Sequence, residues 1–312
     1  MRQDSLNVFG IGKRNALLEL LKAECNDANI ALNGYDASPY CPAANAVYPN
    51  FFVVPQAKSS EHLISVENLL QENQSIGHFS IIDPEIPMLG QLEQKGSLSS
   101  QLLNSTYSTA IICEDKLLLF KALKDFGISV MSTSTSPEFN YPYICKDRFG
   151  SGASGFSVTH SGDAVKVVDE GEALIYQPYC SGEHYCVDAY YSIWTGHLIG
   201  LCAKEVLYKS NGESYTLRSQ PPREFINLLN QVATALPLRG IVNFDIYRHE
   251  DRLVVMDINC RIGGNYPASH LFGCNLLKPM ISELVSKSPT LPCHSNYLED
   301  RTISKYLAFT SP

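Results

Sequence analysis

The sequence predicts an α/β protein whose N-terminal third forms a doubly wound parallel sheet. Strand and helix patterns alternate through the first hundred residues, which is typical of β-α-β units. The polar stretch at 94–109 interrupts this alternation, and we interpret it as a domain boundary. With 312 residues and 45% apolar side chains, the chain can form two or three domains with sizeable cores.

In the first third, strands are predicted at 5–12, 30–36, 51–55 and 78–83, and amphipathic helices at 15–24 and 61–73. In parallel sheets, ligands bind beyond the carboxyl ends of the strands. The polar and small residues expected at that edge are Gly10, Gly12, Asp36, Asp83 and Glu85.

Beyond the boundary, a helix over 113–128 has acids in its first turn and Gly127 as its stop signal. The pattern then predicts a strand at 141–146, a strand–bend–strand unit at 172–193, a helix at 221–236 and a hairpin at 240–259. The polar residues 249–252 form the predicted turn of this hairpin.

Composition narrows the class of protein. The net charge of −8, without any run of Lys or Arg, argues against nucleic acid or an anionic membrane as the main partner. The N-terminus is too polar for a signal peptide, and no apolar stretch approaches the length of a spanning helix. The ten cysteines form no CxxC pair, which favours reduced thiols. We therefore expect a soluble cytoplasmic protein.

A glycine-rich loop follows the strand that ends at Lys146. Its residues are Gly150, Ser151, Gly152 and Gly155. Glycines let backbone N–H groups approach an anion closely, and Lys146 adds a positive charge. Lys116, on a separate helix, could supply a second cation. A flexible surface hairpin and a solvated lysine are the competing interpretations.

The hairpin at 240–259 carries acids on both strands. A short turn places Asp245 opposite Asp257, with Asn259 further along the same strand. Two carboxylates and an amide oxygen are hard ligands that suit Mg²⁺, and Arg261 would face a transferring phosphoryl group. The alternative is a surface hairpin with ordinary salt bridges, but the apolar neighbours of Asp257 indicate burial.

These motifs occur in an order that resembles the ATP-grasp superfamily, in particular its carbamoyl-phosphate-synthase-like and carboxylate–amine ligase branches. The resemblance covers about residues 105–280: a helical lysine, a strand with lysine and glycine loop, "YQPY" with "SGEHYCVD", and "NFD" with "MDINCRIGGN". It implies a Rossmann-like preceding domain (1–103) and a two-lobed α+β ATP-grasp fold. The small lobe would span 104–180 and the C-terminal lobe with the metal site 181–312.

The resemblance also implies roles for individual residues. The phosphates of ATP would be bound by Lys116, Lys146 and the glycine loop, and the adenine by the segment 176–179 with Gln177 and Tyr179. Glu183 would hold the ribose, with His184 as the alternative. Lys204 could reach the γ-phosphate, although surface solvation competes with that interpretation. Magnesium, with manganese as a possible substitute, would be bound by Asp245, Asp257 and Asn259. The family usually has Glu where Asp257 stands.

The implied reaction is ADP-forming C–N ligation. ATP would phosphorylate a small carboxylate to an acyl phosphate, which an amine then attacks, with Arg261 and Lys146 as catalytic residues. Substrates would contact Asp83, Glu85, Arg218, Gly263, Gly264 and Asn265. The "RIGGN" turn could equally be only a helix start. Homodimers are common in the family, so the resemblance also implies a possible homodimer.

Two other functions are compatible with parts of the sequence. A nucleotide-binding regulator without turnover is suggested only by Asp257 in place of Glu. An NAD-dependent oxidoreductase is suggested by Gly10 and Gly12, with Asp36 about twenty residues further on. That fingerprint is incomplete, because Asn15 stands where its third glycine should be.

Overall fold

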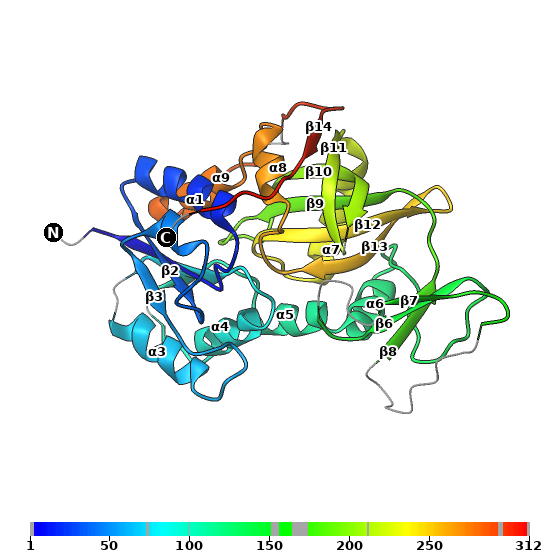
Figure 1. Cartoon of the computed structure of the whole chain (residues 1–312), viewed down its shortest axis with the longest axis horizontal. Coiled ribbons are helices and arrows are strands. Elements are labelled where there is room, and N and C mark those ends of the chain that lie inside the picture. The colour runs from blue at the N-terminus through cyan, green and yellow to red at the C-terminus, as the bar shows by residue number, and fades with distance from the viewer. Residues whose placement is uncertain are drawn as a thin grey trace.

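The computed structural model in Figure 1 describes residues 3–72, 75–98, 100–150, 156–163, 174–210, 212–292 and 296–310. Its strands form a five-stranded, a six-stranded and a three-stranded sheet. The five-stranded and three-stranded sheets lie at opposite ends of the molecule, with the six-stranded sheet between them (Figure 1). The predicted fold class is confirmed, and the boundaries between the three segments stay a prediction.

The N-terminal sheet is parallel throughout, with the order β3-β2-β1-β4-β5. Its strands are β1 (Ser5–Phe9), β2 (Ala31–Asp36), β3 (Phe51–Val53), β4 (Gly77–Ser80) and β5 (Gln101–Leu102). One face carries α1 (Asn15–Asp27), and the other carries α3 (His62–Glu72) and α4 (Glu85–Gln94) (Figure 1). Each helix buries the apolar stripe that its three-to-four-residue spacing predicts, such as Leu17, Leu21 and Cys25 in α1.

Residues from the other end of the chain complete this domain. Helix α9 (Leu277–Ser286) lies beside α1, and its apolar side chains join the same core as the β1 residues Leu6 and Val8. Leu284 approaches Gly77 so closely that a side chain there would collide with it. The N-terminal sheet and the C-terminal segment therefore share one hydrophobic core.

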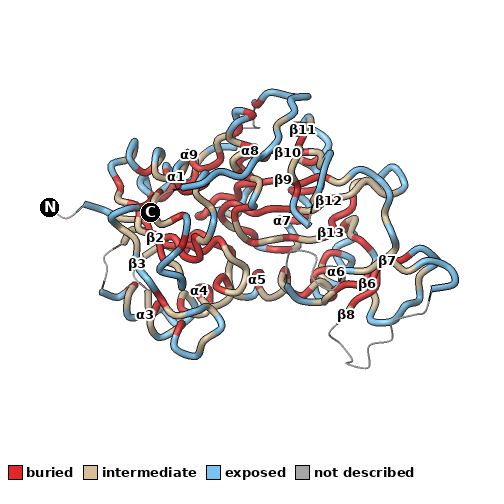
Figure 2. The backbone as a smooth tube through the Cα atoms, viewed as in Figure 1, coloured by how far each residue is buried: buried red, intermediate tan, exposed pale blue. Residues whose placement is uncertain are grey.

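The central sheet is antiparallel, with the order β13-β12-β9-β10-β11-β14. Its strands are β9 (His184–Tyr191), β10 (Leu198–Ser210), β11 (Glu213–Gln220), β12 (Gly240–His249), β13 (Arg252–Asn259) and β14 (Thr302–Ser304). Helix α7 (Arg223–Ala235) packs on one face through Phe225, Leu229 and Val232. Figure 2 shows the central strands β9 and β12 buried over much of their length.

The small sheet has the order β7-β6-β8 and is also antiparallel. It consists of β6 (Tyr143–Asp147), β7 (Ser157–Thr159) and β8 (Leu174–Pro178). The backbone N–H of Met131 bonds to the carbonyl of Val255, so the segment before β6 is anchored to β13 of the central sheet.

Several elements differ from the predictions. The single helix predicted over 113–128 is wrong: the chain forms α5 (Tyr107–Glu114) and α6 (Lys116–Asp125) instead. The break lies at Asp115, whose extended backbone and carboxylate cap α6 by accepting from Leu117 N and Leu118 N. Four further helices were not predicted, namely α4, α9, the single-turn α2 (Ala44–Val47) and α8 (Tyr266–Leu271). Pro87 obscures α4 in the sequence, yet it occupies the first helical turn, where proline is tolerated.

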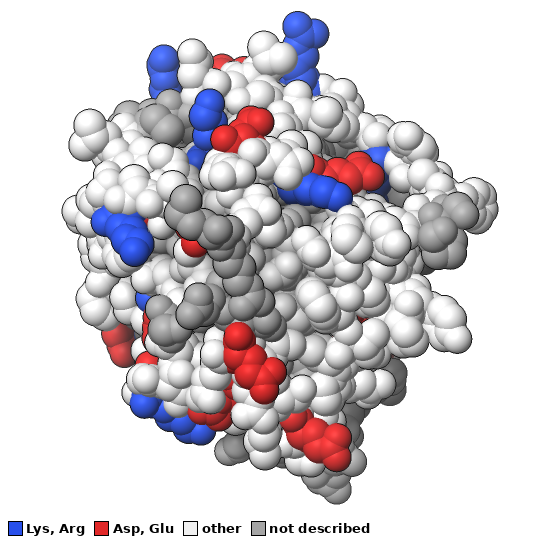
Figure 3. Space-filling model, turned by 90° about the vertical axis from the view of Figure 1, so that its left-hand side faces the viewer, with Lys and Arg blue, Asp and Glu red and all other residues white. Residues whose placement is uncertain are grey.

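Within the described ranges, no helix is both long and apolar enough to cross a membrane. The face in Figure 3 shows scattered Lys and Arg interspersed with Asp and Glu, and its described residues form no continuous basic patch.

Candidate active site

The predicted acids meet on one face of the central sheet. Asp245 of β12 lies directly opposite Asp257 of β13, as the hairpin pattern predicts. The turn is tighter than expected, because only Glu250 and Asp251 form it, both with positive φ. The side chains of Asp257 and Asp245 keep 26% and 32% exposure. Both carboxylates are therefore held by a buried hairpin yet open toward solvent.

Lys146 reaches this face from the small sheet. Its Nζ lies 3.1 Å from Asp257 Oδ2, and the lysine is almost buried. Gln177 lies opposite Ile144 in the register of β6 and β8, so it shares the face of Lys146. Gln177 Nε2 donates to Thr133 Oγ1, while its buried Oε1 has no partner among the described residues. This free acceptor on the wall beside Lys146 suits an N–H donor of a ligand.

Lys116 is the first residue of α6, next to the start of the glycine loop. Its Nζ donates to the carbonyl of Gly150 at 2.7 Å. Arg148 makes two bonds to Asp115 at 2.7 and 2.8 Å, which ties the end of β6 to the N-terminus of α6. Burial lowers the pKa of Lys116, and Asp257 offsets this only in part. Ser151, Gly152 and Gly155 lie outside the described residues.

Asp245 has a histidine partner. His184 Nε2 lies 2.7 Å from Asp245 Oδ1, and the His184 ring stacks on Tyr247. Burial opposes ionisation of Asp245, but the interactions with His184, together with the charges of Lys209 and Lys146, outweigh it and hold the pKa of that carboxyl below its usual value. Glu183 instead faces Arg248 at 3.4 Å and is half exposed. Of the two predicted ribose ligands, His184 is the one that the structure brings to the acids.

Arg261 links the central sheet to the N-terminal domain. Its guanidinium makes two bonds to Asp83, with Nε–Oδ1 2.8 Å and Nη2–Oδ2 2.9 Å. Nη2 also donates to Asn259 Oδ1 at 3.2 Å. Three residues predicted to act at the site are therefore in direct contact, although 178 positions separate Asp83 from Arg261.

Asn259 is held in place by a network of buried polar side chains. Asn259 donates to Asn243 at 3.4 Å, and Asn243 donates to Asp188 at 2.9 Å. Asp188 pairs with Lys204 at 2.6 Å, and Ser269 donates to the same carboxylate. Asn243 and Asp188 were missed by the sequence analysis. The signal for them is their strand register, because Asn243 lies opposite both Asp188 and Asn259.

Lys204 lies on the same face of the central sheet as Asp245 and Asp257, but it is fully buried in this network, whereas those two carboxylates are partly exposed. Burial opposes its charge, but Asp188, together with Cys186 and Cys202, outweighs that effect and raises the pKa of Lys204. Removing Lys204 would leave the Asp188 carboxylate buried without its cation.

We therefore expect Lys204→Met to lower the free energy of unfolding by about 3–5 kcal/mol, as is usual for a broken buried ion pair. Urea denaturation measures the loss. The exposed Lys209 of the same strand provides the control, and Lys209→Met should leave stability nearly unchanged. Normal stability of Lys204→Met, combined with weakened ATP binding, would instead support the predicted γ-phosphate contact.

Two predicted substrate residues lie elsewhere. Arg218 of β11 lies opposite Glu205 of β10 and bonds to it. The next pair along these strands is Lys204 opposite Ser219, and Lys204 lies on the face of Asp245 and Asp257. Adjacent strand positions point to opposite faces, so Arg218 lies on the side of the sheet away from Asp245 and Asp257. Glu85 is buried in the N-terminal domain, where it accepts from Ser80 at 2.6 Å.

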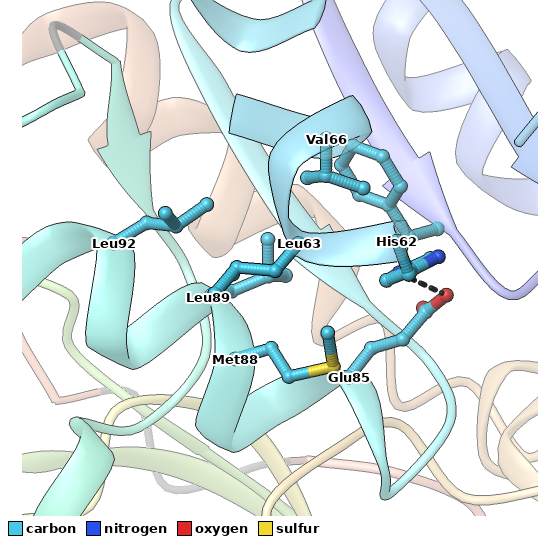
Figure 4. Close-up of a pocket in the computed structure, with 8 residues that line it drawn as sticks. His62, Leu63, Val66, Glu85, Met88, Leu89 and Leu92 are labelled. Atoms are coloured by element: carbon cyan, nitrogen blue, oxygen red, sulfur yellow. Dashed lines mark ion pairs between the residues drawn. The ribbon is translucent and has the colours of Figure 1, made fainter. Parts of the chain in front are cut away.

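Glu85 and His62 face each other in a small pocket between α3 and α4 (Figure 4). His62 Nε2 lies 3.2 Å from Glu85 Oε1, and its Nδ1 lies 2.6 Å from the carbonyl of Pro55. Burial acts to lower the pKa of His62, but these acceptors outweigh it and raise that pKa above 6.5. The fold therefore favours the protonated ring.

The stability from this pair should be present below pH 6.5 and be lost as the pH rises through the raised pKa. We expect the unfolding temperature of the wild type to fall over that window, and His62→Gln to remove this part of the dependence. Parallel pH profiles of the two proteins would contradict the predicted titration.

The "RIGGN" turn leads directly into α8. Gly263 packs against Asn243 and Asp188, where a Cβ would collide with both side chains. Gly264 packs against the guanidinium of Arg14, and Asn265 immediately precedes α8. The helix-start interpretation therefore holds for this turn, and its glycines also permit the close approach of two polar groups.

The residues of the partial dinucleotide fingerprint bond to one another. Asp36 accepts from the backbone N–H of Gly12 at 2.8 Å and from that of Ser38 at 3.0 Å. Both carboxylate oxygens of Asp36 are thus engaged in shaping the loops after β1 and β2.

Two known families match segments of this chain. Residues 113–265 match the ATP-grasp domain family, and residues 6–100 match the family described as PylC-like, N-terminal domain. A search of curated proteins gives no significant match.

Solved structures share the fold at low sequence identity. N5-carboxyaminoimidazole synthetase from Staphylococcus aureus with ADP superimposes with a TM-score of 0.79 and 14% identity, over 97% of this chain and 82% of that one. An L-amino acid ligase from Bacillus licheniformis gives 0.71 and 13%, over 91% and 75%. Biotin carboxylase from Campylobacter jejuni gives 0.74 and 12%, over 96% and 74%.

Proposed function

Because the chain belongs to the ATP-grasp superfamily, we propose that it is an ADP-forming ligase that joins a carboxylate to an amine. The carboxylate is first phosphorylated by ATP, and the amine then displaces phosphate from the acyl phosphate. The observation that carries the proposal is the contact of Lys146 with Asp257, opposite Asp245, between the small and central sheets.

The polar groups around this contact suit Mg-ATP. Lys116 and Lys146 would neutralise phosphate oxygens, and the free Oε1 of Gln177 would accept an N–H of the base. Asp245, Asp257 and Asn259 offer three hard oxygen ligands for Mg²⁺ or Mn²⁺. The bound metal would supply positive charge to the transferring phosphoryl group.

Arg261 would stabilise the negative charge that develops at the reacting carboxylate. Its bonds to Asp83 and Asn259 fix the guanidinium next to the proposed metal ligands, so it needs no reorganisation during the reaction. The rest of the site orients the substrates, and no covalent bond to the protein is required.

Hydroxylamine trapping tests this function without knowledge of the amine. The protein is incubated with Mg-ATP, hydroxylamine and carboxylic acids supplied one at a time, and both ADP and hydroxamate are measured. We expect one class of acid to give the two products in equal amounts. ATP binding without ADP release for any acid would instead support a nucleotide-binding regulator.

A further inference from the structure

Arg14 is a partly buried cation beside the candidate active site. It lies in the loop between β1 and α1, which also carries Gly12, one of the residues expected at the ligand-binding edge of the parallel sheet. No described residue makes a hydrogen bond or an ion pair with its half-buried guanidinium. By contrast, its neighbour Lys13 points outward and pairs with Glu213. The charges of Glu213 and Asp83 offset the burial of Arg14 only in part. A guanidinium withdrawn from water without a directly bonded acid is costly, and a bound anion would remove that cost.

Gly264 holds Arg14 against the turn that follows β13. A Cβ at Gly264 would overlap Arg14 Nη1 and lie 3.1 Å from Cζ, so only glycine permits this approach. The same turn begins next to Arg261, and the charge of Arg261 acts on Arg14. Burial, followed by this like charge, lowers the pKa of Arg14. Two guanidiniums thus flank the start of the "RIGGN" turn.

The two guanidiniums differ in what they face. Arg261 bonds to Asp83 and Asn259, on the side of the proposed metal ligands. Arg14 instead packs on Gly264, three residues after Arg261, and extends from the loop after β1, whereas Lys116 and Lys146 come from α6 and β6. Arg14 and the phosphate-binding lysines therefore come from different parts of the fold, which suits Arg14 to an acceptor rather than to ATP.

We propose that Arg14, packed on Gly264, binds the carboxylate of the amine substrate, which makes that substrate an amino acid. This inference rests on the proposed function: a ligase of this class needs an amine as acceptor, and Arg14 requires that the same molecule carry an anion. The carboxylate bound by Arg14 would be distinct from the one that is phosphorylated, since Arg14 comes from the loop after β1 and the phosphate-binding lysines come from α6 and β6. Arg14 is thus a specificity-determining residue.

The binding arm of the test measures unfolding temperature with single L-amino acids and with their carboxamides, which lack the negative charge. We expect at least one free amino acid, but not its amide, to stabilise the wild type. Arg14→Gln and Gly264→Ala should both lose this shift. Gly264→Ala displaces only the flexible end of Arg14 and keeps its charge. Lys13→Gln removes a neighbouring charge from the same loop and should retain the shift.

The catalytic arm measures ADP release from Mg-ATP with the stabilising amino acid as acceptor. We expect Arg14→Gln to raise KM for that amino acid by about 10- to 100-fold, as for a lost charge-assisted hydrogen bond, with KM for ATP unchanged. Equal binding of acid and amide, an unchanged shift in Arg14→Gln, or no shift with any amino acid would overturn the subsite.

The two arms separate the two proposals. Amino-acid binding that depends on Arg14, without any ADP release, would leave the subsite standing and contradict the ligase function. ADP release that is independent of Arg14 would support the ligase function and contradict the subsite.

Discussion

Asp257→Asn is expected to abolish magnesium-dependent turnover while the protein stays folded. The substitution keeps the size of the side chain but removes the negative charge that would attract the metal and that pairs with Lys146. We expect kcat to fall by about 10²- to 10³-fold or more, the usual cost of removing one electrostatic contact to the transferring group. ADP formation at saturating Mg-ATP measures the effect.

The same hairpin provides the control for this substitution. Asp251 lies in the exposed turn between β12 and β13, and Asp251→Asn removes an equal charge away from the site. This variant should retain full activity. If Asp257→Asn kept its dependence on magnesium, the metal would have to be bound elsewhere.

Arg261→Lys should lower kcat by about 10²- to 10³-fold, although it keeps the positive charge. Lysine cannot reproduce the planar fork that contacts Asp83 and Asn259 together, so its ammonium would not be fixed at the reacting group. The measurement is kcat for ADP release, with unfolding temperature as a check on the fold.

Asp83→Asn tests whether Arg261 acts in catalysis or only links the N-terminal domain to the central sheet. It weakens the same ion pair from the other side but leaves the guanidinium of Arg261 in place. We expect a clearly smaller loss of kcat than for Arg261→Lys. Equal losses in the two variants would mean that Arg261 acts only by holding Asp83.

Regular patterns in the sequence predicted the parts of the site that lie on strands. The alternation of polar and apolar residues placed Asp257 and Asn259 on one face of β13, and the hairpin placed Asp245 opposite. These contacts depend on strand period and on a local turn, which a single sequence reveals.

Contacts that depend on tertiary packing were beyond such patterns. Nothing near Lys204 in the sequence indicates that Asp188, on the neighbouring strand, would bury and neutralise it. Arg14 is similar, because its environment is formed by a turn 250 positions later in the chain. The helix break at Asp115 was missed because its capping carboxylate has the same sequence signature as an acid in a first turn.

The most direct test of the proposed chemistry follows oxygen from the carboxylate to phosphate. The acid identified by hydroxylamine trapping is labelled with ¹⁸O in its carboxylate, and the released phosphate is analysed by mass spectrometry. If the acid is activated as an acyl phosphate, each phosphate released by attack of the amine carries one labelled oxygen from the acid. Unlabelled phosphate, or formation of AMP and pyrophosphate, would contradict the acyl-phosphate mechanism.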